Sequence, residues 1–97
     1  MTYEYAKKKI DDLFNRALEE IDRINQLIKP YADWLDMTLW AARKERAVYE
    51  YLAAARVVIE MYIEFAEGDS HWRELHAIQW TYAEKLEIEI KASNKTD

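Results

Sequence analysis

Hydrophobic side chains recur with a helical period in the first third of the chain. From position 10 to position 28 they are spaced alternately four and three residues apart, which places them on one face of a helix. The stripe consists of Ile10, Phe14, Ala17, Ile21, Ile24 and Ile28. Charged residues such as Arg16 and Glu19 occupy the opposite face, so we expect an amphipathic helix over residues 2–29. Pro30 ends this helix, because proline disfavours helical geometry in the residue before it.

A second pattern runs from Pro30 to about Ala66 and predicts a long helix, since proline also suits the first turn of a helix. Unbroken, this helix would be about 55 Å long. Its second half is hydrophobic nearly all round, and few charged residues interrupt it. Between positions 47 and 66 they are Glu50, Arg56, Glu60 and Glu64. Because a helix of this kind is enclosed by more than one neighbour, we expect residues 30–66 to form the central helix of the fold.

The clearest turn in the sequence is Glu67-Gly68-Asp69-Ser70. Gly68 can adopt the left-handed conformation that closes a helix, and Asp69 or Ser70 can cap the next one. Residues 71–92 then place a mainly hydrophobic set on one face, namely Trp72, Leu75, Gln79, Tyr82, Leu86 and Ile90. Residues 86–90 also alternate as a strand would, but no second strand pattern exists to pair with them. The sequence therefore predicts an all-α, three-helix antiparallel bundle, followed by a polar tail at residues 93–97.

The first half of the central helix is expected to be poorly covered. If the helices form simple antiparallel hairpins, the third helix reaches back only to about Arg46. Large hydrophobic residues before that point would be exposed, and such patches usually mark an interface. They are Trp34, Leu35, Leu39 and Trp40. We expect these residues to complete the bundle by oligomerisation, as a homodimer, or to bind another protein. The alternative is that the helix breaks near Asp36 and the extra piece folds back as a lid.

Lys44 is a charged residue in the middle of the hydrophobic arc of the central helix. A buried ammonium group is costly unless it reaches water or a partner. We expect it to extend past the edge of the third helix into water. Two alternatives are a polar contact that sets the register of an oligomer, and an anionic ligand held by Lys44 with the hydroxyl groups of Tyr31 and Tyr51.

Composition excludes several classes of protein. The chain has 97 residues with one Gly, one Pro and no Cys, which excludes disulfide scaffolds, Cys-ligated metal sites and glycine-rich phosphate loops. No run of about 18 apolar residues is present, so no transmembrane helix is expected. The start of the chain lacks the apolar segment of a signal peptide, and we therefore expect a cytoplasmic protein.

The net charge of -5 lies entirely in residues 60–97, which hold nine acidic and four basic residues. The acidic residues are expected to form one face near the second turn, made of Glu60, Glu64, Glu67, Asp69 and Glu74. Such a face attracts a partner with a basic surface and repels phosphate backbones, so nucleic acid is not an expected partner. An ordinary solvated surface is the alternative interpretation.

The sequence offers little catalytic chemistry. His71 and His76 are five residues apart and therefore lie on different faces of a helix, unlike the i, i+4 pair of a helical zinc site. Glu64/Glu67 and Glu84/Glu87 have the spacing of Mg²⁺-binding carboxylate pairs in all-α hydrolases. In an antiparallel hairpin, however, the two pairs would be offset by roughly 15 Å. We expect no metal and no cofactor.

Three functions remain, in decreasing order of support. The first is a non-enzymatic helical interaction domain, a homo-oligomeric inhibitor or adaptor that binds another protein, a class that includes virus-encoded proteins. The second is a small-ligand-binding or sequestering protein, with an aromatic pocket of Tyr31, Trp34, Trp40 and Tyr51 and Lys44 as its polar group. The third is a metal-dependent all-α hydrolase.

Overall fold

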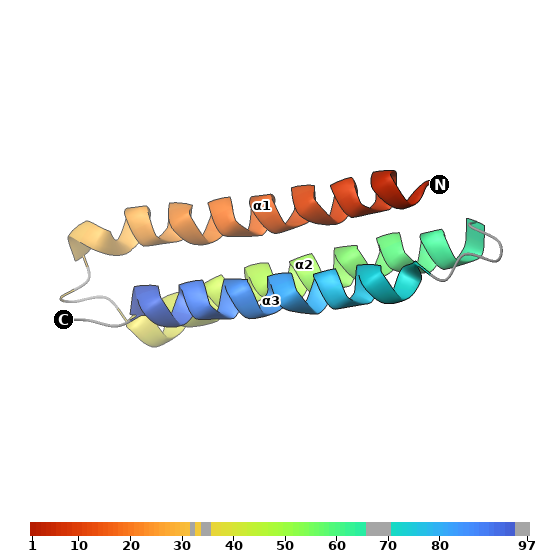
Figure 1. Cartoon of the computed structure of the whole chain (residues 1–97). Coiled ribbons are helices and arrows are strands. Elements are labelled where there is room, and N and C mark those ends of the chain that lie inside the picture. Colours follow the sequence, from red (N-terminus) through yellow and green to blue (C-terminus); the bar gives the residue numbers. More distant parts are fainter. Residues whose placement is uncertain (32, 34–35, 66–70, 95–97) are drawn as a thin grey trace.

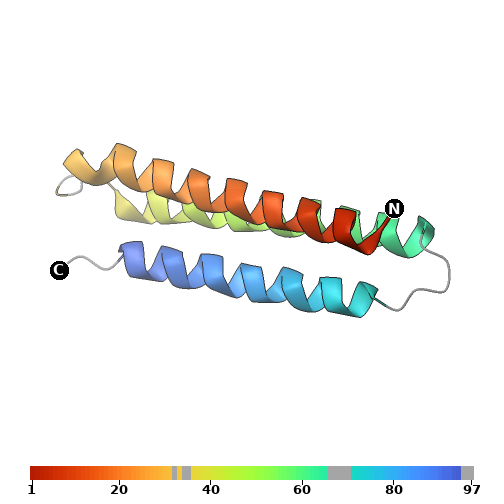
Figure 2. The same cartoon turned by 45° about the horizontal axis from the view of Figure 1, so that its top comes forward.

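The computed structural model describes residues 1–31, 33, 36–65 and 71–94, and within them it is an all-α, three-helix antiparallel bundle without strands (Figure 1). Helix α1 spans Tyr3–Ile28, α2 spans Met37–Phe65 and α3 spans Trp72–Asn94, and a short 3-10 turn, η1, covers Lys29–Tyr31. The bundle is a rod of 55 × 17 × 17 Å. Figure 2 shows α1 and α2 together along one side of the bundle and α3 along the other, and each of the three helices contacts the other two.

The start of the central helix differs from the sequence-based expectation. We expected a helix from Pro30, but α2 begins at Met37, and Pro30 lies in the 3-10 turn instead. The cause is local, because the Asp36 carboxylate accepts a hydrogen bond from the Thr38 backbone N–H at 3.0 Å and so caps a new helix. The helix is therefore interrupted before Asp36, and α2 is short enough for α1 and α3 to cover most of its length. Trp34 and Leu35 lie outside the described residues.

The core consists of one face from each helix, as the hydrophobic periods predicted. In α1 the buried residues include Ile10, Ala17, Ile21, Ile24 and Ile28, and in α3 they are Leu75, Gln79, Ala83, Leu86 and Ile90. From α2 the core receives Ala47, Val48, Tyr51, Ala55, Ile59 and Tyr62. Because α2 contacts both other helices extensively, it is the central element of the bundle.

Three polar contacts set the alignment of α3 against its neighbours. The Tyr51 hydroxyl donates to the Gln79 carbonyl at 3.1 Å, and the Gln79 side-chain amide donates to the Leu52 carbonyl at 3.3 Å. On the α1 side, the Tyr82 hydroxyl donates to the Asp11 carboxylate at 2.5 Å. Hydrophobic packing alone would allow α3 to slide along its neighbours. These hydrogen bonds depend on direction and distance, so they favour one alignment of α3.

Lys44 is fully buried rather than extended past α3 into water. Its ammonium donates to the Ser93 hydroxyl at 3.2 Å, and that hydroxyl donates to the Ile90 carbonyl at 2.9 Å. We expected Ser93 to lie in a polar tail, but α3 continues to Asn94 and brings this residue to Lys44. Burial lowers the pKa of the Lys44 ammonium, because leaving water disfavours the charged form.

We expect Lys44→Met to increase the free energy of unfolding at pH 7 by about 1–3 kcal/mol, since an apolar side chain of similar size removes the desolvation cost. Ser93→Ala should lower the free energy of unfolding by about 1 kcal/mol, because the buried Lys44 ammonium loses a hydrogen-bond acceptor. Urea denaturation followed by circular dichroism measures both values. Ser93→Ala should be nearly neutral in the Lys44→Met background, and an undiminished cost there would contradict the assigned contact.

Candidate functional site

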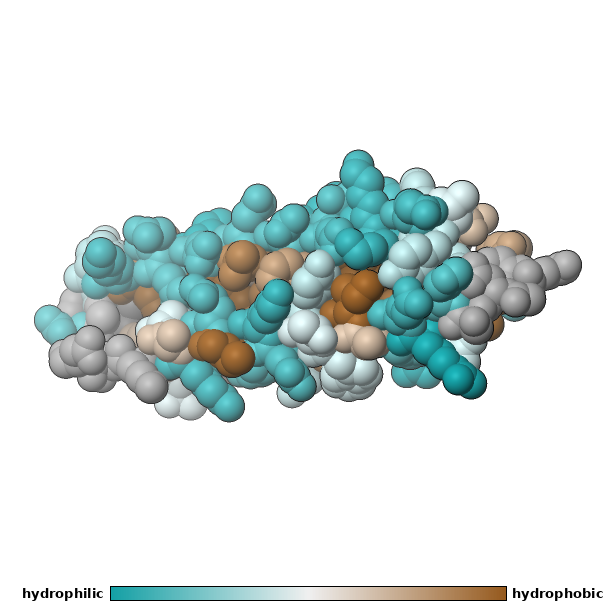
Figure 3. Space-filling view, in the orientation of Figure 1, coloured by the Kyte–Doolittle hydropathy of each residue, from teal (hydrophilic) through white to brown (hydrophobic). Residues whose placement is uncertain are grey.

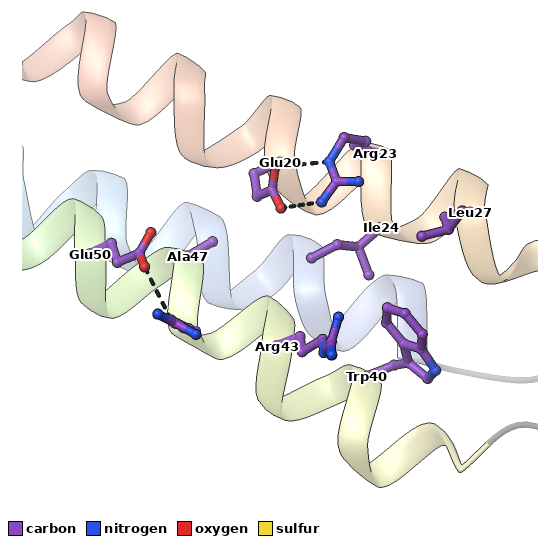
Figure 4. A pocket seen from close by; sticks show the side chains of 9 residues that line it. Glu20, Arg23, Ile24, Leu27, Trp40, Arg43, Ala47 and Glu50 are labelled. Carbon is purple, nitrogen blue, oxygen red and sulfur yellow. Dashed lines mark hydrogen bonds and ion pairs between the residues drawn. The ribbon is translucent and has the colours of Figure 1, made fainter.

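A groove of about 410 Å³ lies between α1 and α2, near the end of the bundle where these two helices are joined (Figure 4). Its lining comes from both helices: Glu20, Arg23, Ile24 and Leu27 from α1, and Trp40, Arg43, Arg46, Ala47 and Glu50 from α2. In each helix the lining residues recur at spacings of three, four and seven, so they form one continuous strip of that helix. We call this the α1–α2 groove.

The floor of the groove is hydrophobic and its rim is charged. Ile24 and Ala47 are buried at the floor, whereas Leu27 is half exposed beside them. The guanidinium of Arg23 makes two hydrogen bonds to the Glu20 carboxylate, at 2.6 and 3.0 Å. The Arg46 guanidinium contacts the Glu50 carboxylate at 3.1 Å. Both pairs are solvent-exposed and contribute little to stability, so they serve mainly to neutralise the rim.

The ion pair of Arg23 and Glu20 also shifts the titration of both groups. The hydrogen bond from Arg23 lowers the pKa of the Glu20 carboxyl, and the same bond raises the pKa of Arg23. Both groups therefore remain charged over the physiological pH range, and each neutralises the charge of the other.

Arg43 differs from the other two arginines of the groove. Its guanidinium lies 4.8 Å from the centre of the Trp40 ring, in a cation–π contact (Figure 4). Within the described residues it has no carboxylate partner, so its charge is available to an incoming group. Trp and Arg are also the residue types that contribute most often to binding energy at interfaces.

Two residues of the predicted interface fall in this region. Trp40 lines the groove, and Leu39 is 52% exposed immediately before it, while Trp34 and Leu35 lie outside the described residues. The α1 residues and the arginines of the groove were missed by the sequence analysis. Their matching strips on two helices were visible in the sequence, but only the packing of α1 against α2 shows that the strips face each other.

The residues proposed as a ligand pocket have different surroundings. Lys44 is buried against Ser93, the Tyr51 hydroxyl is bonded to the Gln79 carbonyl, and Tyr31 is exposed in η1. Tyr51 lines a groove between α1 and α2, and neither Tyr31 nor Lys44 lines that groove.

The predicted acidic face is only partly described. Glu60 accepts a hydrogen bond from Arg56 at 3.0 Å, whereas Glu64 is exposed at the end of α2. Glu74 lies in the first turn of α3, beside Tyr3 of α1. Burial and a hydrogen bond to Glu74 raise the pKa of the Tyr3 hydroxyl. Glu67 and Asp69 lie outside the described residues, so a continuous acidic face stays a prediction.

The two histidines contact aromatic rings. His71 lies 5.1 Å from the Tyr3 ring centre, and His76 lies 5.8 Å from that of Trp72. In the part of the chain that the structure describes, no three His, Cys, Asp or Glu residues come close enough to hold a metal ion. None of the helices found there is long and apolar enough to cross a lipid bilayer.

Among the carboxyl groups of the described residues, Glu45 of α2 has the most strongly shifted pKa. Burial between α2 and α3 raises its pKa to about 7, and a hydrogen bond and charge repulsion from Glu87 of α3 add to the effect. Lys91 opposes the shift through its positive charge. This pair was not predicted, because Glu45 and Glu87 become neighbours only when α3 packs on α2.

We expect Glu45 to contribute a fall in the free energy of unfolding as the pH rises from about 4.5 to about 7. In that range the folded chain still binds a proton at Glu45 that the unfolded chain has released. Glu45→Gln should flatten this dependence and stabilise the protein at pH 8 by up to about 1 kcal/mol, after allowance for solvent screening. Denaturation curves at several pH values test this, with the exposed Glu50→Gln as the control. Equal slopes for Glu45→Gln and wild type would contradict the assignment.

No known protein family matches the chain, and neither a curated protein nor a solved structure is significantly similar to it. No residue role can therefore be transferred from a relative. The function has to be inferred from the chemistry of the chain's own residues. Their most distinctive arrangement is the α1–α2 groove.

Proposed function

We propose that this chain is a non-enzymatic helical interaction domain that binds another protein through the α1–α2 groove. The observation that carries the proposal is the stack of Arg43 on Trp40 at the edge of a partly hydrophobic groove. A Trp ring beside a guanidinium that has no carboxylate partner in the described part of the chain forms an anchor of the kind found at the centres of protein interfaces. A protein that binds a partner protein in this way, without catalysis, acts as an inhibitor or an adaptor.

The lining of the groove specifies the chemistry of the partner. An apolar side chain fits over Ile24 and Ala47 and against Leu27, because this surface gains by leaving water. A carboxylate next to it can bind Arg43, since guanidinium and carboxylate match in charge and geometry. The two antiparallel helices form a linear groove, which suits a partner helix with an apolar stripe and an acidic residue.

The paired charges of the rim favour a protein over a small molecule as the ligand. Glu20, Arg23, Arg46 and Glu50 all lie at the surface, where they can exchange partners with charged groups across an interface. A volume of about 410 Å³ is within the range of small-ligand sites, but such sites enclose most of their ligand behind apolar walls. The lining of the groove has five charged side chains, those of Glu20, Arg23, Arg43, Arg46 and Glu50.

Arg43→Glu should weaken binding of the partner at least tenfold, because it places a negative charge where the partner's carboxylate docks. The measurement is quantitative affinity capture from the source cells, followed by titration calorimetry with the captured protein. Arg73→Glu is a matched control, since Arg73 also stacks on a tryptophan, Trp72, at 5.3 Å, but lies at the opposite end of the bundle.

Trp40→Ala should reduce the same affinity at least tenfold through loss of the aromatic anchor. Circular dichroism should show unchanged helicity for all three variants. Equal binding by Arg43→Glu and Arg73→Glu would refute the groove as the binding site. Saturable binding of a small anion to the groove, with no protein captured, would instead support a ligand-binding function.

A further inference from the structure

A second hollow continues the α1–α2 groove towards the middle of the bundle. It has a volume of about 230 Å³ and lies between the same two helices. Glu20, Ala47 and Glu50 line both hollows, so the two are adjacent. The lining of the second hollow consists of Leu13, Arg16, Ala17 and Glu20 from α1 and of Ala47, Glu50, Tyr51 and Ala54 from α2. We call it the Arg16 hollow.

Together the α1–α2 groove and the Arg16 hollow extend over about four turns of each helix. On α1 they reach from Leu13 to Leu27, and on α2 they reach from Trp40 to Ala54. Each of these stretches is about 21 Å long, which is the length of a helix of about 15 residues. By contrast, on the side where α1 and α3 face the viewer, hydrophobic surface emerges in separate patches among hydrophilic side chains (Figure 3).

The charge of this strip is opposite in sign to that of the whole chain. Four arginines and two glutamates line the two hollows, whereas the chain has a net charge of -5. Both glutamates are paired with arginines of the groove. None of the ion pairs found in the described part of the chain involves Arg16 or Arg43. Two positive charges of the strip therefore remain available, and they attract a negatively charged segment.

The spacing of these two arginines follows from the packing of α1 on α2. Glu20 of α1 is level with the stretch from Ala47 to Glu50 of α2, since these residues line both hollows. Arg16 is four residues before Glu20, and Arg43 is four to seven residues before that stretch. Because the two helices are antiparallel, the two rises add. Arg16 and Arg43 therefore lie about 12 to 16 Å apart along the bundle.

We propose that the α1–α2 groove and the Arg16 hollow together bind one helix of the partner protein, about four turns long, with two acidic residues seven or eleven positions apart. This inference rests on the proposed function, since it specifies the segment that the groove recognises. Residues at these spacings share one face of a helix and are about 10 and 16 Å apart. One carboxylate binds Arg43 and the other binds Arg16. Apolar residues between them pack on Ala17 and Ala47, whose small side chains let the helices approach closely.

A helix fits this strip better than other acidic ligands do. A strand would need a free row of backbone groups to pair with, and the backbone groups inside α1 and α2 are bonded within those helices. A small anion can contact one of the two guanidiniums but cannot reach both. A nucleic acid would bring phosphates close to the paired glutamates and to a chain of negative net charge, which repels them.

Synthetic helices provide the first test. Three peptides of about 18 residues have the same composition, with alanines and glutamines, leucines on one face, and two glutamates placed seven, nine or eleven positions apart. The spacing of nine is the matched control, because it sets the two carboxylates on opposite faces at an intermediate distance. Circular dichroism should show similar helicity for all three peptides.

Titration calorimetry with the wild-type chain gives the three affinities. We expect the peptide with a spacing of seven or of eleven to bind at least fivefold more tightly than the peptide with a spacing of nine, which leaves one guanidinium without a carboxylate. Equal affinity of all three peptides overturns the proposal, as does the absence of binding at about 1 mM.

A charge swap tests the two arginines individually. Arg16→Glu and Arg43→Glu should each weaken binding of the tightest peptide at least tenfold, whereas Arg73→Glu, at the opposite end of the bundle, should leave it unchanged. Replacement of one peptide glutamate by lysine should restore binding to Arg16→Glu to within about threefold of the wild-type pair. Replacement of the other glutamate should restore binding to Arg43→Glu. If neither variant is rescued, the assigned contacts are wrong.

The same variants separate this inference from the proposed function. Capture of the cellular partner should be weakened by both Arg16→Glu and Arg43→Glu. If Arg43→Glu weakens capture and Arg16→Glu does not, the α1–α2 groove is still the binding site, but the partner helix does not extend into the Arg16 hollow, and this inference is overturned. If neither variant weakens capture, the proposed function is refuted together with it.

Discussion

Helix α2 carries hydrophobic side chains over more of its circumference than α1 and α3 can cover, and this constraint shapes the whole molecule. A strip that includes Tyr51, Ala55 and Ile59 lies at the centre of the bundle and loses almost all contact with water. The neighbouring positions fall at the two boundaries where α2 meets another helix. Each boundary leaves a groove on the outside of the bundle, because cylinders in contact do not fill the space between their surfaces. The α1–α2 groove and the hollows between α2 and α3 arise in this way.

The two grooves differ because different side chains of α2 face them. On the α1 side, Arg43, Arg46 and Glu50 make the rim polar, and one guanidinium there has no carboxylate partner within the described residues. On the α3 side, Val48 and Leu52 combine with Trp80 and Ile88 to make a more hydrophobic surface. The first groove therefore presents charged groups and one aromatic ring, whereas the second presents mainly apolar area. Ala47 and Val48 are adjacent in sequence and lie on opposite sides of this division.

Polar groups inside the bundle limit how its helices can slide. Lys44 is fully buried and bonded to Ser93, and the Gln79 side chain is bonded to the Leu52 carbonyl. A shift of α3 by one turn would break both contacts and leave polar groups in an apolar interior, which is costly. The alignment of α3 decides which residues meet at the α2–α3 boundary. It thereby brings Glu45 next to Glu87 and places Trp80 between two hollows.

The sequence alone determined the class of the fold, the number of helices and most of their buried faces. Helical periodicity is a local property, so the stripe from Ile10 to Ile28 and the buried positions of α3 could be predicted without knowledge of their partners. The first residue of α2 could not be predicted in this way. Both Asp36 and Pro30 can start a helix, and a sequence pattern does not show which of the two does so.

The tertiary structure decided everything that requires two helices to face each other. Lys44 finds its acceptor 49 residues away in Ser93, and Trp40 with Arg43 forms a groove only because α1 packs beside them. Leu39 and Trp40 were identified from their hydrophobicity, while Arg23 and Leu27 were not, since nothing within α1 marks them as neighbours of α2. The physical reason is that periodicity defines which face of a helix is apolar. The rotation and alignment of one helix against another define which side chains meet.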